Sequence, residues 1–142
     1  MTMYVLDTNV LSEARRPAPN RSMLAWLASV PDHRLYISVI VIGEIRRGIL
    51  IRAKTDQRGA QRLDLWLDEL IGNYAFGDRL LQVSLEDALV WGRITAEHRH
   101  LPDADALIAA QALARDWTVV TRNVKDFERT GVRLLNPFEY EG

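Results

Sequence analysis

The chain has 142 residues, of which 48% are hydrophobic and 26% charged, and its formal net charge at pH 7 is −1. This composition supplies enough apolar surface for one folded domain over residues 1–142, and the charge argues against a strongly basic nucleic-acid binder. The absence of cysteine excludes disulfides and thiolate metal sites. No apolar run approaches the roughly 18 residues of a membrane span, and no signal peptide is visible. We therefore expect a cytoplasmic protein without a membrane partner.

The first part of the chain predicts one strand and two short helices. Residues 3–6 form an apolar run of strand length that ends at Asp7. A helix is expected over residues 8–14, because prolines interrupt the chain soon afterwards. A second helix is expected over residues 21–29, directly after Asn20, which is a good N-cap residue.

The next part predicts a strand followed by two long helices. Residues 35–37 should form the strand, and Ser38 can cap a helix over residues 39–52. Apolar residues, Trp66 among them, recur at helical spacing between residues 57 and 74. This spacing predicts a long amphipathic helix, and such a helix usually packs on its own domain.

The last part alternates strands and helices again. The sequence Ser84-Leu85-Glu86-Asp87 has the capping-box pattern that opens a helix. The expected elements are a strand at 81–83, helices at 85–99 and 104–114, and strands at 118–121 and 133–135. The helix at 104–114 is almost wholly apolar and should be deeply buried.

Strands that alternate with helices predict an α/β fold, with a parallel sheet covered on both faces. Ligands of such sheets bind beyond the carboxyl ends of the strands. Asp7 after the first strand and residues 123–126 after the fourth are therefore candidate site residues. Acidic residues on helices that begin near the same edge are further candidates.

The first acidic candidates are Asp7 and Glu44. An aspartate at the end of a strand more often caps the next helix than binds a ligand, so Asp7 alone is weak support for a site. Glu44 interrupts the apolar run 39–45, and a carboxylate buried there needs a metal ion or a salt bridge. Arg46 and Arg47 are possible salt-bridge partners, although residues two positions apart do not share a helix face. We expect a functional role for Glu44.

Two further acidic residues, Asp103 and Asp105, stand at the start of the apolar helix. Residues two positions apart on a helix do not face each other, so one site cannot easily use both. Asp103 follows Pro102 and fits an N-cap, whereas Asp105 falls in the first turn, where the helix dipole favours a negative charge. We therefore expect Asp105 to be the ligand, with Asp103 as a weaker candidate.

Three polar residues, Thr121, Asn123 and Asp126, closely follow the fourth expected strand. Each can join the site, or it can stabilise a turn by bonding its own backbone. Carboxylates gathered from distant positions repel one another and stay ionised together only with a cation. Oxygen ligands without cysteine or paired histidine favour Mg2+ or Mn2+ over Zn2+. Such a site suits phosphodiester hydrolysis, in which the ion activates water and offsets charge on the phosphate.

Four motifs along the chain resemble those of the PIN-domain ribonucleases. They are Val-Leu-Asp7-Thr-Asn9-Val-Leu-Ser, Ser38 with Glu44 and Ile45, Asp105-Ala-Leu-Ile-Ala-Ala, and Val-Thr121-Arg-Asn123. Within that family the order and spacing of the motifs are most similar to the VapC toxins of the FitB-like branch. Residues 131–138 are also similar to that group, so the resemblance covers nearly the whole chain.

The resemblance implies a PIN-like fold over residues 1–142, with a central parallel sheet flanked by helices and a helical arm. It implies a Mg2+-dependent endoribonuclease, the toxin of a type II toxin–antitoxin system, that cuts RNA of the tRNA or ribosomal RNA class. The implied partners are a VapB-type antitoxin, whose tail occupies the acidic groove, and a second copy of the chain in a homodimer. In such a protein the helix at 57–74 helps to form the dimer or to grip the antitoxin, an alternative to packing only on its own domain.

Catalytic positions of the family carry over to Asp7, Glu44 and Asp105, with Asp7 and Asp105 as the principal metal ligands. Many members have an aspartate where this chain has Asn123, so Asp126 is the expected substitute at the fourth acidic position. Asn123 can still bind a metal-bound water. The residues expected to orient the carboxylates are Thr8, Asn9, Ser38 and Thr121.

Two other interpretations compete with a nuclease. A non-catalytic PIN-like module that binds RNA or protein would share the fold without the chemistry. A phosphotransfer receiver domain is also a small parallel α/β protein with an acidic pocket, but here Asp7 is followed by Thr8 rather than by a second acid. For the nuclease, Arg46 and Arg122 are candidates to hold the RNA backbone at the rim of the groove.

Overall fold

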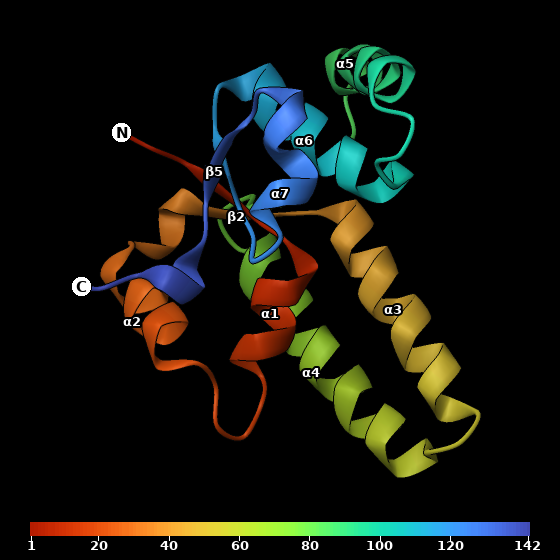
Figure 1. The fold of residues 1–142 in the computed structure, drawn as a ribbon. Coiled ribbons are helices and arrows are strands. Elements are labelled where there is room, and N and C mark those ends of the chain that lie inside the picture. Colours follow the sequence, from red (N-terminus) through yellow and green to blue (C-terminus); the bar gives the residue numbers. More distant parts are fainter.

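A parallel sheet of five strands forms the centre of the structure, a computed structural model that describes residues 1–142 (Figure 1). The strands are β1 Tyr4–Leu6, β2 Leu35–Ser38, β3 Leu80–Leu81, β4 Thr118–Val120 and β5 Arg133–Leu135. Their order across the sheet is β3-β2-β1-β4-β5, and every neighbouring pair is parallel. The predicted α/β fold is confirmed.

The chain begins in the middle of this sheet, because β1 lies between β2 and β4. Val5 is fully buried and is paired with Tyr36 on one side and Val119 on the other. At the carboxyl end of β1 the backbone N–H of Asp7 donates to the carbonyl of Val120 (2.9 Å). Side chains that follow β1 and β4 are therefore neighbours, although they come from opposite ends of the sequence.

Seven α-helices connect and cover the strands. They are α1 Thr8–Ala14, α2 Arg21–Ser29, α3 Val39–Ala53, α4 Gln57–Ala75, α5 Leu85–Glu97, α6 Asp103–Arg115 and α7 Val124–Phe127. Short 3-10 helices lie at Asp32–Arg34, Glu128–Thr130 and Pro137–Glu139. None of the helices combines the length and the apolar composition that a membrane crossing requires.

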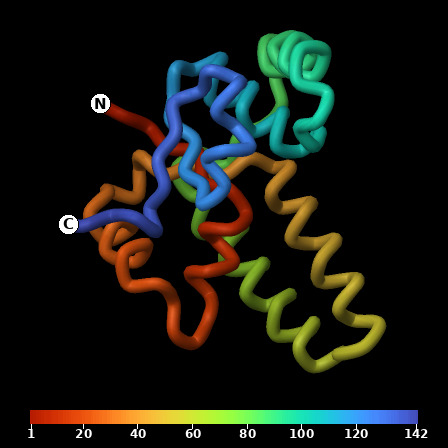
Figure 2. Tube along the Cα trace, viewed as in Figure 1, coloured from red at the N-terminus to blue at the C-terminus, as the bar shows by residue number.

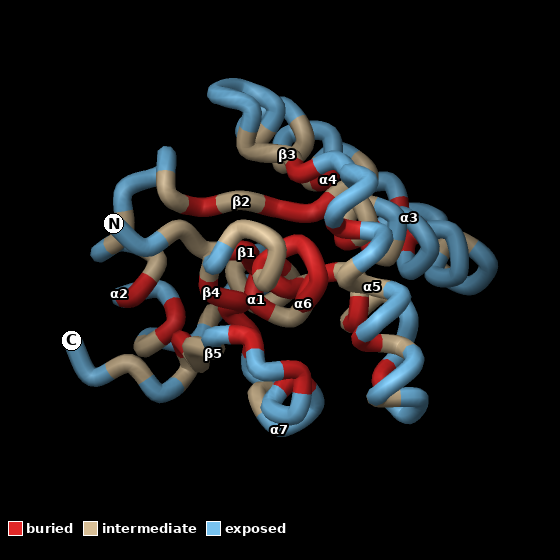
Figure 3. Tube along the Cα trace, turned by 90° about the horizontal axis from the view of Figure 1, so that it is seen from above, coloured by how far each residue is buried: buried red, intermediate tan, exposed pale blue.

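The helix α6 is the most deeply buried, as its apolar sequence predicts. Its alanines at positions 106, 109, 110 and 112 are fully buried, and their small side chains let the helix approach β1 and β4 (Figure 3). This helix and the sheet contribute to one hydrophobic cluster of 25 buried residues. The first turn of α6, which carries Asp105, is thereby held rigidly against the sheet.

The helices α3 and α4 form the predicted helical arm, in which they pack along each other and project from the sheet (Figure 2). On α3 the buried side chains are Val41, Ile45 and Ile49, which recur every four residues on one face. On α4 the buried side chain of Leu67 faces them, as its amphipathic pattern predicts.

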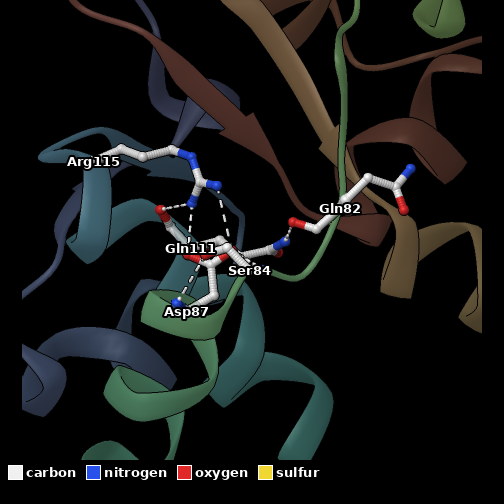
Figure 4. Close-up of polar contacts among 5 residues, drawn as sticks. All are labelled: Gln82, Ser84, Asp87, Gln111 and Arg115. Atoms are coloured by element: carbon white, nitrogen blue, oxygen red, sulfur yellow. Dashed lines mark hydrogen bonds and ion pairs between the residues drawn. The ribbon is translucent and has the colours of Figure 1, made fainter.

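A buried ion pair ties the start of α5 to the end of α6 (Figure 4). The carboxylate of Asp87 is fully buried and lies 2.8 Å from the Arg115 guanidinium. Asp87 also completes the predicted capping box, because it exchanges hydrogen bonds with Ser84. Beside this pair, Gln111 donates to the carbonyl of Gln82, while its own Oε1 is buried without a partner.

Most element boundaries differ from the predictions by one or two residues, and three differences have a clear physical reason or position. The strand β3 covers Leu80–Leu81 rather than 81–83, because the backbone N–H of Ser84 is engaged in the capping box and Val83 turns outward, 46% exposed. The short helix α7 stands where no element was predicted and where a turn was one of the alternatives. The predicted N-cap role of Asp103 is wrong, since the carbonyl of Pro102 already accepts the first helical hydrogen bond, from Ala106 (2.9 Å), and Asp103 makes no capping bond.

Candidate active site

Asp7 is the most firmly held side chain of the candidate site. It is 5% exposed and accepts hydrogen bonds from the Thr121 hydroxyl (2.8 Å), the Thr8 backbone N–H (2.8 Å) and the Asn9 side-chain amide (3.2 Å). The bond from Thr8 is the helix cap that a strand-end aspartate was expected to make. In this cap the Oδ1 atom of Asp7 accepts a hydrogen bond from one donor, the Thr8 backbone N–H. The same oxygen therefore keeps a free lone pair that can bind a cation.

Asn9 and Thr121 link the loops that follow β1 and β4. The Asn9 amide donates to the Thr121 hydroxyl oxygen (3.1 Å), and its carbonyl oxygen accepts from the backbone of Arg122 (3.1 Å). The Thr121 oxygen also accepts from the backbone N–H of Asn123 (3.1 Å). These hydrogen bonds hold the Asp7 carboxylate in one orientation, and the role of Asn9 and Thr121 in metal binding stays a prediction.

Glu44 lies on α3 close to the start of α1, where its Oε1 accepts a hydrogen bond from the Thr8 hydroxyl (3.0 Å). The expectation that it would be fully buried is wrong. The apolar run 39–45 winds around a helix, and only the face of Val41 and Ile45 meets the core, so Glu44 is half-buried. The salt bridges considered for it are also absent, because Arg46 binds Asp64 of α4 instead.

Asp105 occupies the first turn of α6, as predicted, and is the carboxylate with the most perturbed titration. Burial, followed by the negative charges of three other carboxylates, raises the pKa of Asp105 to about 6. The three charges belong to Asp7, Glu44 and Asp126. They act on Asp105 only because all four carboxyl groups gather at one edge of the sheet.

The residue at the fourth acidic position stays a prediction, but the charge of Asp126 does reach the other carboxylates. Burial raises the pKa of Asp7, its hydrogen bonds from Thr121, Thr8 and Asn9 lower it, and the charge of Asp126 raises it again, so that the net shift is upward. Asp126 thus acts on both Asp7 and Asp105. Asn123 and Asp126 are both exposed, and the Asn123 side chain at the start of α7 makes no capping bond.

Two predicted residues lie outside this cluster. Ser38 is fully buried, but its hydroxyl accepts from the backbone of Ile40 (3.2 Å), so it starts α3 rather than orienting a carboxylate. Asp103 is exposed and is not among the charges that act on Asp105. Of the two arginines expected at the rim, Arg46 is turned to α4, and Arg122 lies over the ring of Phe138, 4.6 Å from its centroid.

The donor set of the cluster consists of carboxylate, amide and hydroxyl oxygens, which suits a hard divalent cation. The structure has no group of three or more acidic or histidine side chains that could together hold a metal ion. Mg2+ does not require one, since it typically takes one or two carboxylates and retains several waters. A cation held by Asp7 and Asp105 would also offset the burial and the carboxylate repulsion that together raise the pKa of both groups.

Side chains that border Glu44 were missed by the sequence reasoning. Ser12, Arg15 and Arg52 line the same hollow as Thr8 and Glu44. A pattern in the sequence could have revealed part of this set, because Thr8, Ser12 and Arg15 are four and three residues apart and share one face of α1.

Comparisons with known proteins assign the chain to a family. The sequence profile of the PIN domain matches residues 4–132. The chain belongs to the PIN-domain family. This PIN domain is 34% identical to plasmid stability protein StbB of Pseudomonas syringae pv. tomato over 96% of the chain and 99% of the relative. It is 32% identical to VapC ribonuclease Y4jK of Sinorhizobium fredii, again over 96% and 99%.

Solved structures agree with the sequence relatives. The PIN domain superposes on the structure of FitAcB from Neisseria gonorrhoeae with a TM-score of 0.85 at 30% identity, over 96% of this chain and 99% of that one. The resemblance to PIN-domain ribonucleases of the VapC and FitB type is therefore confirmed, and so is the PIN-like fold.

Proposed function

We propose that this PIN domain is a metal-dependent endoribonuclease, the toxin of a type II toxin–antitoxin pair, with Mg2+ as its ion and Mn2+ as a substitute. The observation that carries the proposal is the placement of Asp7, after β1, beside Thr8, which also bonds Glu44 of α3, together with a pKa of Asp105 that is raised by burial and then by the charges of Asp7, Glu44 and Asp126. Full-length relatives that are named ribonuclease support it.

In the proposed reaction the chain's own residues position the reactants. Mg2+, when bound, would supply positive charge beside the scissile phosphate and would activate a water. Asp7 and Asp105 would hold the ion, and Asp7 keeps its orientation through the bonds from Asn9 and Thr121. Glu44, fixed by the Thr8 hydroxyl, would orient the attacking water. Hydrolysis would form one P–O bond to the water oxygen and break the P–O bond opposite it, and the leaving oxygen would take up a proton from solvent in place of the one that the water loses.

The proposal extends to partners. Solved relatives include FitAB bound to a DNA fragment and a VapBC2 complex from Rickettsia felis, which supports an antitoxin for this chain as well. We propose a VapB-type antitoxin that blocks the acidic site, a homodimer, a location in the cytoplasm, and RNA of the tRNA or ribosomal RNA class as substrate.

Replacing Asp7 tests the proposed chemistry. Asp7→Asn removes a charge that the ion needs but keeps the size and most hydrogen bonds of the side chain, so the fold should persist. We expect Mg2+-dependent RNA cleavage to fall by roughly a hundredfold or more, measured with purified protein on total RNA, while circular dichroism stays unchanged.

The matched control is Asp103→Asn, an exposed aspartate two residues from Asp105, which should cleave as the wild type does. A fully active Asp7→Asn protein would contradict the proposal. Wild-type protein that cleaves no RNA with Mg2+ or Mn2+, once freed from any partner, would favour a non-catalytic binding module.

A further inference from the structure

A groove leads away from Glu44 between α1 and the arm formed by α3 and α4. It consists of two adjoining hollows of about 260 and 290 Å3 that share Arg15, Arg52, Leu63 and Trp66. The inner hollow includes Thr8 and Glu44 of the candidate active site. The outer hollow adds a third arginine. We call this surface the arginine groove and define it by Arg15, Arg52, Arg62, Leu63 and Trp66.

The arginine groove carries more positive than negative charge, because its three arginines have Asp56 as a neighbouring carboxylate near Arg52 and Arg62. Arg15 and Arg62 are exposed and form no ion pair. Arg52 pairs with Asp56 (3.2 Å), but both side chains are more than 40% exposed, and exposed pairs of this kind contribute little. Burial and the nearby charges of Arg52 and Arg16 lower the pKa of the Arg15 guanidinium, as expected where cations crowd together.

An aromatic side chain lies beside these cations. Trp66 of α4 is half-buried and lines both hollows, with the Arg15 guanidinium 5.8 Å from its ring centroid. Arginines beside a partly exposed aromatic ring are the combination with which proteins bind single-stranded nucleic acid, phosphates contacting the cations while a base stacks on the ring.

Charge balance gives this groove a role in the proposed reaction. The candidate active site is negative and repels a polyanion, and the chain's net charge of −1 offers no general attraction. The positive charge that attracts the RNA must therefore come from a patch close to the active site. This patch must lie where the RNA strand continues beyond the scissile bond. The arginine groove meets both requirements, because its inner end opens on Glu44.

We propose that the arginine groove binds the single-stranded RNA segment next to the scissile phosphate, with Arg15 and Arg62 on phosphates and Trp66 under a base. This inference rests on the proposed ribonuclease function. An acidic peptide would match the charge, but the continuity of the groove with the acidic site favours the substrate strand itself.

Binding measured without catalysis tests the groove directly. Wild-type chain with EDTA is titrated into a short fluorescein-labelled single-stranded RNA over a range of KCl concentrations, and anisotropy gives Kd. Arg15→Ala/Arg62→Ala should weaken binding, and the slope of log Kd against log salt should fall by about 0.7 for each phosphate that the variant no longer neutralises. Arg93→Ala is the matched control, an exposed arginine of α5 that makes no ion pair and lies outside the groove.

Trp66 provides a second, independent readout. Trp66→Leu should weaken binding by about tenfold without changing the salt slope, because stacking involves no counterion, whereas Trp66→Phe should retain most of the affinity. Circular dichroism verifies that each variant is folded.

The outcomes separate this inference from the proposed function. Unchanged RNA affinity and an unchanged salt slope in the double arginine variant overturn the inference. A double variant that keeps its RNA affinity but no longer binds the antitoxin also overturns it, because the groove would then be a protein-binding surface. A wild-type chain that binds RNA through these residues but never cleaves it supports the groove and contradicts the nuclease.

Discussion

Thr8 joins the two halves of the candidate site. Its backbone N–H donates to Asp7 and its hydroxyl donates to Glu44, so one residue at the start of α1 fixes a carboxylate from the sheet and another from the arm. Asn9 makes the equivalent link between Asp7 and Thr121 across β1 and β4. The motif Asp-Thr-Asn thus acts through its hydrogen bonds as much as through the charge of Asp7.

Asp105 shows the cost of gathering carboxylates without a cation. Burial and three like charges raise its pKa to about 6, so at neutral pH the ionised group destabilises the metal-free fold. Asp105→Asn should therefore abolish RNA cleavage and yet stabilise the metal-free protein by about 1 kcal/mol, a value kept small because the group is half-open to solvent.

The measurement is urea unfolding at pH 7 in EDTA for the wild type and Asp105→Asn. Asp103→Asn, on the same turn but outside the cluster, controls for the substitution itself and should leave stability unchanged. Destabilisation by Asp105→Asn would contradict the repulsion argument.

At the scale of elements, the arrangement of α5 and α6 depends on the buried pair of Asp87 and Arg115. Burial alone would raise the pKa of Asp87, but the hydrogen bonds from Arg115 and Ser84 outweigh it, and the net shift is downward. A lowered pKa in the folded state means that the pair stabilises the fold above the ordinary aspartate pKa of 3.8 and that this contribution is lost as pH falls through the lower folded value.

Asp87→Asn should accordingly destabilise the protein at pH 7 by about 2–3 kcal/mol, because it leaves the Arg115 charge without its partner. The difference from the wild type should shrink below pH 4, where the wild-type carboxyl itself becomes protonated. Urea unfolding of the wild type and of Asp87→Asn, at pH 7 and at a pH below 4, measures this difference in stability. Asp116→Asn is the control, since Asp116 and its partner Arg133 are 79% and 63% exposed, and its loss should be nearly neutral at either pH.

Apolar patterning was sufficient to predict most elements, and its failures have physical causes. The segments that form β1 and α6 are largely apolar, so the sequence predicts a buried strand and a buried helix there. Helix α7 has only four residues, too few for a helical period to show. The burial of Glu44 was overestimated because an apolar run predicts a buried segment, whereas only one face of the arm helix α3 meets the core.

At the scale of the whole molecule, strand order creates the site. The sequence could propose Asp7, Glu44 and Asp105 as the site carboxylates. The choice of Asn123 or Asp126 for the fourth position stays a prediction, since the placement of both depends on how β1 and β4 pair. The arginine groove was equally out of reach, because it combines α1, α3 and α4, whose relative placement no local pattern contains.

Because the site joins both ends of the chain, an ion bound there should stabilise the entire fold. Mg2+ that binds only the native state adds about 2.7 kcal/mol at a concentration one hundred times its Kd, which corresponds to a rise in Tm of about 5 to 10 °C for a domain of this size. Thermal unfolding of the wild type across a MgCl2 series should show this rise, and Asp7→Asn should largely lose it. KCl at matched ionic strength screens the carboxylates without bridging them, so it should give a much smaller shift. Equal shifts with KCl and MgCl2 would mean that screening alone acts on the acidic cluster and would argue against a specific metal site.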